Sequence, residues 1–220
     1  MEYLFSQAGA EIGLRWLHFF FGVVWIGTLY YFNFIQGEFF KEAEAATKSN
    51  MIQKQLPRAL DWFRYGALWT FVTGAAILAL RGANITDTLF VGVLLGTLMF
   101  LNVWLVIWPN QKIVIASTTQ VAQGGAALPG AAAAGPKALL ASRTNVAFSL
   151  AMLFFMGAGA HMPFGMFELG SLKIWVAVAI IGALEVNGLV GKLGFMSTVK
   201  GVIHAGVGLT LVLLGVMVFL

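Results

Sequence analysis

Three histidines are the residues of this 220-residue chain best suited to ligate a metal or carry a proton. His18 lies near the start of a long apolar run, His161 ends another, and His204 begins a third. Each has a glycine four residues away, which clears one helix face beside the imidazole: Gly22, Gly157 and Gly208. A flat macrocycle needs such room when an imidazole ligates haem iron. The alternative is that these glycines serve ordinary helix packing, where small residues are also common.

A second set of polar residues centres on Glu185, which lies about 12 residues into an apolar run. A carboxyl group inside a membrane helix must be neutral, paired or in contact with water, so it is a functional candidate by default. Asn102 and Asn187 fall at a similar depth. A hydrogen bond between Glu185 and His204 would satisfy both groups. We therefore take Glu185, His204 and Asn102 as candidate catalytic residues, with a purely structural pairing as the alternative.

The elements that position these residues are membrane-spanning helices. Hydrophobic residues make up 60% of the chain and charged residues 10%, and the mean hydropathy is +0.87. A spanning helix needs roughly 20 mostly apolar residues. The runs between charges predict an all-α integral membrane bundle in a single domain, 1–220, with six spans: 14–36, 63–80, 88–108, 145–162, 172–190 and 200–220. We expect two long connections, 38–61 and 110–144, on the cytoplasmic side.

The basic residues predict the orientation. Ten of them fall in or beside the first, third and fifth connections, and only Arg15, Arg81 and Lys173 fall on the opposite side. Positive residues stay in the cytoplasm, so both termini should face the periplasm of a bacterial inner membrane. The net charge of +4 therefore reflects topology, and we expect membrane lipid and no nucleic acid as a partner.

This orientation places His18 and His161 together near the outer face. The two imidazoles are therefore candidate metal ligands, the axial pair of a b-type haem, with interfacial histidines bonded to water or backbone as the alternative. Arg15 would hold a haem propionate, and Arg81 either the same group or a lipid phosphate. His204 has no histidine at its own depth, so it would be a single ligand or none.

The two long connections differ in composition. Residues 38–61 predict an extended helix, a break and a short amphipathic segment that ends at Pro57. Residues 110–144 contain GGAALPGAAAAGPK, which predicts a low-complexity hinge with little capacity to form a core. Neither connection indicates a separate soluble domain.

Three stretches resemble the membrane domain of the bacterial membrane-bound urate oxidase family: LRWLHFFFGVVWIGTLYYFNF, VWLVIWPNQK and ASRTNVAFSLAMLFFMGAGAH. The resemblance covers most of residues 10–165, and the segment from Ser142 to His161 is its most specific part. It implies a multi-helix membrane protein linked to redox chemistry. Carried over by motif, it adds Arg143 to His18 and His161 as a cofactor-binding candidate, together with Asn145. Asn102, Trp104 and Trp108 come second.

In that family a c-type cytochrome domain typically follows the membrane domain. This sequence has no cysteine, which excludes covalent haem attachment, disulfides and thiolate metal sites within it. We therefore expect the cytochrome tail to be missing and electrons to pass to a separate cytochrome c or respiratory complex.

Three hypotheses remain open. The first is a redox subunit that holds a b-type haem. The second is an oxidase for urate or another small heterocycle, with Glu185 or His204 as the proton acceptor. The third is an accessory subunit without a cofactor that stabilises a membrane complex.

Overall fold

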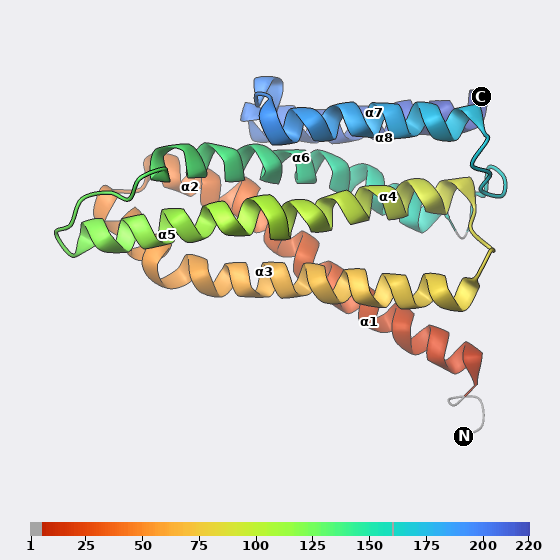
Figure 1. Ribbon diagram of the computed structural model, residues 1–220, viewed down its shortest axis with the longest axis horizontal. Coiled ribbons are helices and arrows are strands. Elements are labelled where there is room, and N and C mark those ends of the chain that lie inside the picture. The colour runs from red at the N-terminus through yellow and green to blue at the C-terminus, as the bar shows by residue number, and fades with distance from the viewer. Residues whose placement is uncertain (1–5, 160) are drawn as a thin grey trace.

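Helices that run back and forth along one common axis make up nearly all of the chain (Figure 1). The computed structural model describes residues 6–159 and 161–220. The long helices are α1 (Gln7–Tyr30), α3 (Ala45–Arg81), α4 (Asp87–Leu101), α5 (Trp108–Ala122), α6 (Ala131–Ala158), α7 (Leu172–Val190) and α8 (Val199–Phe219). Shorter elements are the π-helical segments η2 (Tyr31–Gln36) and η3 (Asn102–Ile107), the helix α2 (Gly37–Glu42) and the 3₁₀ turn η4 (Gly194–Ser197).

The described residues form six helices long and apolar enough to cross a membrane. Two of these six are continuous helices that include a π-helical segment: Gln7–Glu42 consists of α1, η2 and α2, and Asp87–Ala122 consists of α4, η3 and α5. No strand occurs in residues 6–159 and 161–220 beyond an isolated bridge between Thr86 and Met166. The all-α membrane-type bundle predicted from composition and run length is thus confirmed.

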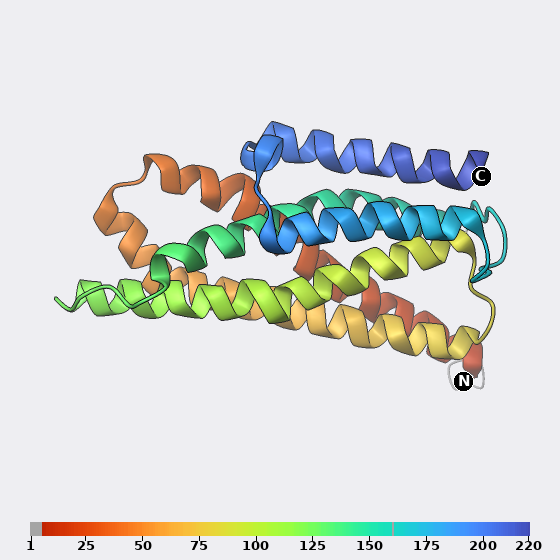
Figure 2. The same ribbon diagram turned by 45° about the horizontal axis from the view of Figure 1, so that its top comes forward.

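The ends of the bundle differ in how far the helices reach. We call the end where α1 begins and α8 finishes the terminal end, and the opposite end the loop end (Figures 1 and 2). At the loop end α2, the start of α3 and the α5–α6 connection extend well past the α7–α8 hairpin (Figure 2). The helices are correspondingly longer than the predicted spans, because Gln7–Glu42, Ala45–Arg81 and Asp87–Ala122 each have 36 or 37 residues.

Most of the predicted connections are helical, which corrects the expected local structure. The chain does break at Ala43 and Glu44, but α3 then runs through Pro57 to Arg81 without ending. Likewise α6 begins at Ala131, inside the predicted hinge, and includes Pro136. Alanine is the strongest helix former, so the alanine-rich half of this segment extends α6 and only 123–130 remains a loop.

The helix boundaries agree with the other predicted spans. Segments 172–190 and 200–220 coincide with α7 and α8 to within one residue. Span 145–162 starts within α6 and continues past its end at Ala158, through residue 160, which lies outside the described residues. The predicted position of the N-terminus also involves residues 1–5, which are not described.

Close approaches through glycine hold the bundle together. A Cβ on Gly66 of α3 would lie 3.1 Å from the backbone nitrogen of Trp25 in α1. A Cβ on Gly92 of α4 would meet the backbone of α6 at Met156 at the same distance. Gly188 of α7 faces Thr144, and Gly206 of α8 faces the backbone of Ala147. Helix α6 thus packs against α4, α7 and α8, while α1 packs on α3, as small residues permit in membrane helices.

Candidate functional site

A cleft of ≈ 400 Å³ opens between four helices in the half of the bundle nearer the terminal end. Its lining is mostly apolar and comes from α1, α3, α4 and α6. Such a volume lies in the range of small-molecule and cofactor sites. The polar or polarisable side chains that matter for ligand chemistry are Arg15, His18, Trp25, Arg81, Met152 and Met156.

His18 lines this cleft with a defined tautomer. Its Nδ1 lies 3.2 Å from the hydroxyl oxygen of Thr73. That hydroxyl already donates its hydrogen to the backbone carbonyl of Trp69, at 2.7 Å. Thr73 must therefore accept from Nδ1–H, which leaves the lone pair of a neutral ring on Nε2. No hydrogen bond to Nε2 occurs among the described residues, so this nitrogen is free to ligate a metal.

Two arginines share one carboxylate at the mouth of the cleft. Arg15 forms an ion pair with Glu11 one turn earlier in α1, at 2.5 Å. Arg81, at the end of α3, lies 3.9 Å from the same carboxylate oxygen. With one negative charge between two positive ones, the mouth retains a net charge of +1, which favours a ligand with an acidic group.

Trp25 carries an unused donor at the deeper end of the cleft. The side chain is 2% exposed, and its indole Nε1–H has no hydrogen-bond partner among the described residues. Buried donors usually find a partner, so an unpaired one beside a cavity indicates a bound molecule or water.

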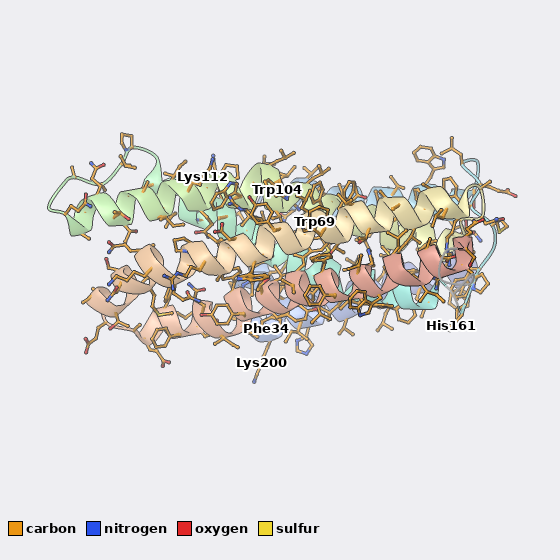
Figure 3. The ribbon with its side chains drawn as sticks, turned by 90° about the horizontal axis from the view of Figure 1, so that it is seen from below. Phe34, Trp69, Trp104, Lys112, His161 and Lys200 are labelled. Atoms are coloured by element: carbon orange, nitrogen blue, oxygen red, sulfur yellow. The ribbon has the colours of Figure 1, made fainter. Side chains whose placement is uncertain are left out.

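His161 does not line the cleft. It is an exposed residue just after α6, where its backbone N–H donates to the carbonyl of Ala158. Figure 3 shows it at the terminal end of the bundle, far along the axis from Lys112. Within the described residues no hydrogen bond joins it to His18, although Met156, Gly157 and Gly159 shortly before it line the cleft. The axial pairing of His18 with His161 stays a prediction without a contact to support it.

The second predicted site is a closed hydrogen-bonded group, which we call the amide cluster: Asn102, Asn145 and Glu185. The Asn102 side-chain amide donates to Asn145 Oδ1 and to Glu185 Oε2, both at 3.0 Å. Asn145 in turn donates to the backbone carbonyl of Met99, at 3.0 Å. Three helices therefore meet through one network: the α4–η3 helix, α6 and α7. The prediction that Asn102 and Glu185 share one polar region is consistent with this geometry.

The predicted partners His204 and Asn187 lie elsewhere. His204 is exposed on α8, since Val202 and Gly206 are the buried residues of that turn. Asn187 exchanges hydrogen bonds with the backbone of Lys192 and so caps the end of α7. The proposed Glu185–His204 hydrogen bond is therefore not formed, and Glu185 is paired with Asn102 instead.

Arg143 lies buried near the middle of α6. It is 3% exposed, and its Nη2 lies 3.7 Å from Glu38 of α2. Its Nε and Nη1 have no partner among the described residues. The neighbouring Ser142 accepts a hydrogen bond from Asn33 of η2, at 2.8 Å. Arg143 thus belongs to an α2–η2–α6 contact, and no contact places it in the cleft.

Both π-helical segments occur where these polar contacts form. Asn33 and Gln36 belong to η2, and Asn102 begins η3. Such segments are rare and are often found at functional sites. Asn33 and Gln36 were missed in the sequence, although two amides inside an apolar run are a usable signal. Trp104, also in η3, is partly buried, and its buried Nε1 has no hydrogen-bond partner in the part of the chain that the structure describes.

Arg64 is enclosed by aromatic rings. Its guanidinium lies 3.9 Å from the centre of the Trp108 ring and 4.8 Å from that of Tyr65. Trp108 thus serves a cation–π contact in which the charge is shielded from lipid. Figure 3 shows Trp104 and Trp69 near the middle of the bundle, away from both ends.

The described residues contain no group of three or more histidine, aspartate or glutamate side chains arranged to hold a metal ion. At the cleft the protein offers one imidazole whose Nε2 has no hydrogen-bond partner among the described residues.

The fold and its cleft define a multi-helix protein of membrane type with an internal cleft. Residues 81–217, well over half of the chain, match the family model described as urate oxidase N-terminal. The chain belongs to that family, as its resemblance predicted. The match includes α4 to α7, most of α8 and the whole amide cluster, and it continues beyond residue 165, where the range covered by the resemblance ended. No curated protein and no solved structure matches the chain.

Proposed function

We propose that this chain is a membrane redox subunit that binds a b-type haem in the cleft, with His18 as an axial ligand. The observation that carries the proposal is the tautomer of His18, whose Nδ1–H is held by Thr73 while Nε2 remains free in a ring that lines the cleft. Metal-ligating histidines commonly donate their other ring N–H in this way, which fixes the ring orientation.

The other residues that line the cleft also support haem as its ligand. The glycines at the wall leave room beside it: a Cβ on Gly157 would meet nothing within 4 Å, and one on Gly96 would only reach ordinary contact distance. Arg15 and Arg81 would bind the propionates at the mouth, in competition with Glu11. Trp25 would donate its unpaired indole N–H to a ring substituent or a bound water.

The bound haem would supply one-electron chemistry, and the protein would hold and insulate it. The partner in this proposal is a cytochrome c or a larger respiratory complex that exchanges electrons with the subunit. The proposal keeps the orientation predicted from charge, a bacterial inner membrane with the terminal end in the periplasm, so that the cleft lies on the periplasmic side.

An absorbance spectrum of the protein purified from membranes tests this proposal. We expect a Soret band and about one haem per chain by pyridine haemochrome assay. His18→Ala should abolish the band, whereas His204→Ala, an exposed histidine on α8, should retain it. A colourless wild type from haem-sufficient cells, or a His18→Ala variant with full haem content, would overturn it.

A second candidate function is the oxidation of urate or another small heterocycle. The amide cluster favours it, because Glu185 is a carboxylate held inside the bundle in the part of the chain that matches the urate oxidase family. Turnover of urate should then disappear in Glu185→Gln. Unchanged turnover in that variant and in the Glu185→Gln, His204→Ala double variant would exclude both residues as proton acceptors.

The third candidate is an accessory subunit without a cofactor. Its support is the broad apolar surface of α7, η4 and α8, where side chains such as Trp175, Phe195 and Leu211 are exposed. Such a chain should co-purify stoichiometrically with its complex and lack a spectrum of its own.

A further inference from the structure

We propose that a second hollow, a groove between α1 and α3, binds one anionic phospholipid at the edge of the bilayer nearer the loop end. The groove has a volume of ≈ 500 Å³ and shares no residue with the haem cleft except for the neighbourhood of the α1–α3 crossing. The proposal goes beyond the proposed function, because it concerns another site and needs no haem.

The crossing of α1 and α3 creates the groove. A Cβ on Gly66 would lie 3.1 Å from the backbone nitrogen of Trp25, so the two helices touch at this point. Helix α1 is inclined to α3 (Figure 1), so the helices separate from the crossing toward the loop end. Gly27 lines the groove without a side chain to fill it, and a Cβ there would meet nothing within 4 Å. The space is therefore open to a ligand from outside the protein.

The polarity of the groove changes along its length. Val23 and Val24 line the end nearer the crossing, whereas Tyr31 and Gln55 line the end nearer the loop end. Gln55 Nε2 donates to the Tyr31 hydroxyl oxygen at 3.0 Å. The hydroxyl hydrogen of Tyr31 has no acceptor among the described residues. A ligand that fits this groove has an apolar chain at one end and a hydrogen-bond acceptor at the other.

The depth of the groove in the membrane is that of a lipid headgroup and the upper part of its acyl chains. A helix needs roughly 20 residues to cross the hydrocarbon core. Counted along α3 from its last residue, Arg81, this length ends at Trp62. Trp62 lines the groove and is 66% exposed, as is common for tryptophan at a membrane interface. The polar end of the groove thus lies among headgroups and the apolar end in hydrocarbon.

An unpaired positive charge stands beside the polar end. Arg58 lies on the same face of α3 as Gln55 and Trp62, from which it is three and four residues away. It is exposed, and it forms no ion pair within the described residues. The nearest acidic residue along α3, Asp61, pairs with Arg64 at 2.9 Å. A guanidinium next to a free hydroxyl donor favours the phosphate of an anionic lipid, whereas an uncharged lipophile would use neither group.

The test titrates the full chain, purified and delipidated in detergent, with phosphatidylglycerol or with zwitterionic phosphatidylcholine of the same acyl chains. Native mass spectrometry counts the bound lipid. We expect one phosphatidylglycerol to bind about fivefold more tightly than phosphatidylcholine, as one basic contact near the membrane surface would give. Arg58→Gln should remove this preference and leave the binding of phosphatidylcholine unchanged. Lys137→Gln, which removes an exposed basic residue of α6, should bind both lipids like the wild type.

A second pair of variants tests the apolar end of the groove. Gly27→Leu places a large side chain where the acyl chain would lie, and it should weaken the binding of both lipids by about tenfold or more. Gly13→Leu, at an equally open position of α1 outside the groove, should bind like the wild type. Equal binding of the two lipids by the wild type would overturn the proposal. Equal losses in Arg58→Gln and Lys137→Gln, or wild-type binding in Gly27→Leu, would overturn it as well. Haem does not enter this measurement, so a wild type without haem would contradict the proposed function alone.

Discussion

The cleft and the amide cluster are both polar sites inside one helical bundle, yet they differ in whether their polar groups have hydrogen-bond partners. In the amide cluster each hydrogen of the Asn102 amide has an acceptor, and Asn145 both accepts and donates. In the cleft, Nε2 of His18 and the indole N–H of Trp25 have no partner among the described residues, and space remains beside them. A network in which every polar group has a hydrogen-bond partner stabilises a fold, whereas unpaired polar groups beside a cavity are available to bind a ligand.

The range of the family match also distinguishes the two regions. The matched range contains all of the amide cluster, whereas His18 and the rest of α1 precede it. The cleft is therefore built half from matched helices, α4 and α6, and half from α1 and α3. We expect substitutions in the amide cluster to change stability first, and substitutions in the cleft to change ligand binding first.

The largest effect should follow from removing the centre of the amide cluster. Asn145→Leu leaves one hydrogen of the Asn102 amide unpaired inside the bundle. It also removes one hydrogen bond from the Met99 carbonyl, which keeps the bond from the backbone N–H of Asn102. At roughly 1–3 kcal/mol for a buried unpaired group and about 1 kcal/mol for a lost hydrogen bond, we expect a loss of about 3 kcal/mol in the free energy of unfolding. Denaturant titration in detergent measures it. Asn187→Ala, which removes only an exposed cap, should cost less than about 1 kcal/mol, and equal losses would contradict the distinction.

A smaller effect should follow when the helices that form the cluster are forced apart. A Cβ on Gly188 would lie 2.7 Å from the Thr144 hydroxyl oxygen, one residue from Asn145. Overpacking of this kind costs roughly 1–3 kcal/mol, so Gly188→Ala should lower the free energy of unfolding by about 2 kcal/mol. Gly182→Ala on the same helix meets nothing within 4 Å and should be neutral or stabilising.

A double variant isolates the contact. Thr144→Ala removes the hydroxyl and methyl groups that the new Cβ would strike, so Gly188→Ala should cost less in that background. The same loss with and without Thr144 would show that the strain arises elsewhere.

The sequence predicted the helices well and the partner of Glu185 poorly, for one physical reason. Run length and composition determine which segments cross a membrane, so the six spans needed no tertiary information. Counting residues along a helix gives the depth of a side chain in the membrane, but it does not give the side of the helix on which that side chain lies. Glu185 and His204 lie at similar distances from their shared turn, yet one points toward Asn102 and the other away from the bundle.

The same limit applies to the cleft. A histidine is conspicuous in an apolar sequence and a methionine is not, so Met152 and Met156 were not singled out, although both line the cleft with His18. Which side chains share a cleft depends on the packing of α1, α3, α4 and α6, which only the folded bundle supplies. The π-helical segments were likewise unpredictable, because the backbone hydrogen bonds shift there in response to packing across helices.

Filling the cleft should spare stability while abolishing ligand binding. Gly157→Leu places a large apolar side chain where a Cβ meets nothing within 4 Å. Replacing a helical glycine gains roughly 0.5–1 kcal/mol of helix propensity, so the free energy of unfolding should stay the same or rise by up to that amount.

The haem content of Gly157→Leu should fall at least tenfold. Gly208→Leu, at a similarly open position on α8 outside the cleft, should leave haem content unchanged. A strongly destabilised Gly157→Leu variant would mean that this space is closed in the folded protein.

The smallest effect should come from the charge at the mouth of the cleft. Glu11 is partly exposed and neutralises one of the two arginines that face the ligand, so Glu11→Gln raises the local net charge from +1 to +2. Exposed ion pairs contribute roughly 0.2–1 kcal/mol, so the affinity for haem and its propionates should rise by about threefold at low salt. Exposed charges are screened over about 10 Å at 0.1 M ionic strength, and the gain in affinity should disappear at high salt.

Haem titrations at two ionic strengths measure this gain in affinity, with Glu38→Gln near the loop end as the control. If Glu11→Gln weakened binding instead, the carboxylate would be orienting Arg15 and Arg81 toward the ligand, and the mouth would resemble the amide cluster more than an open site.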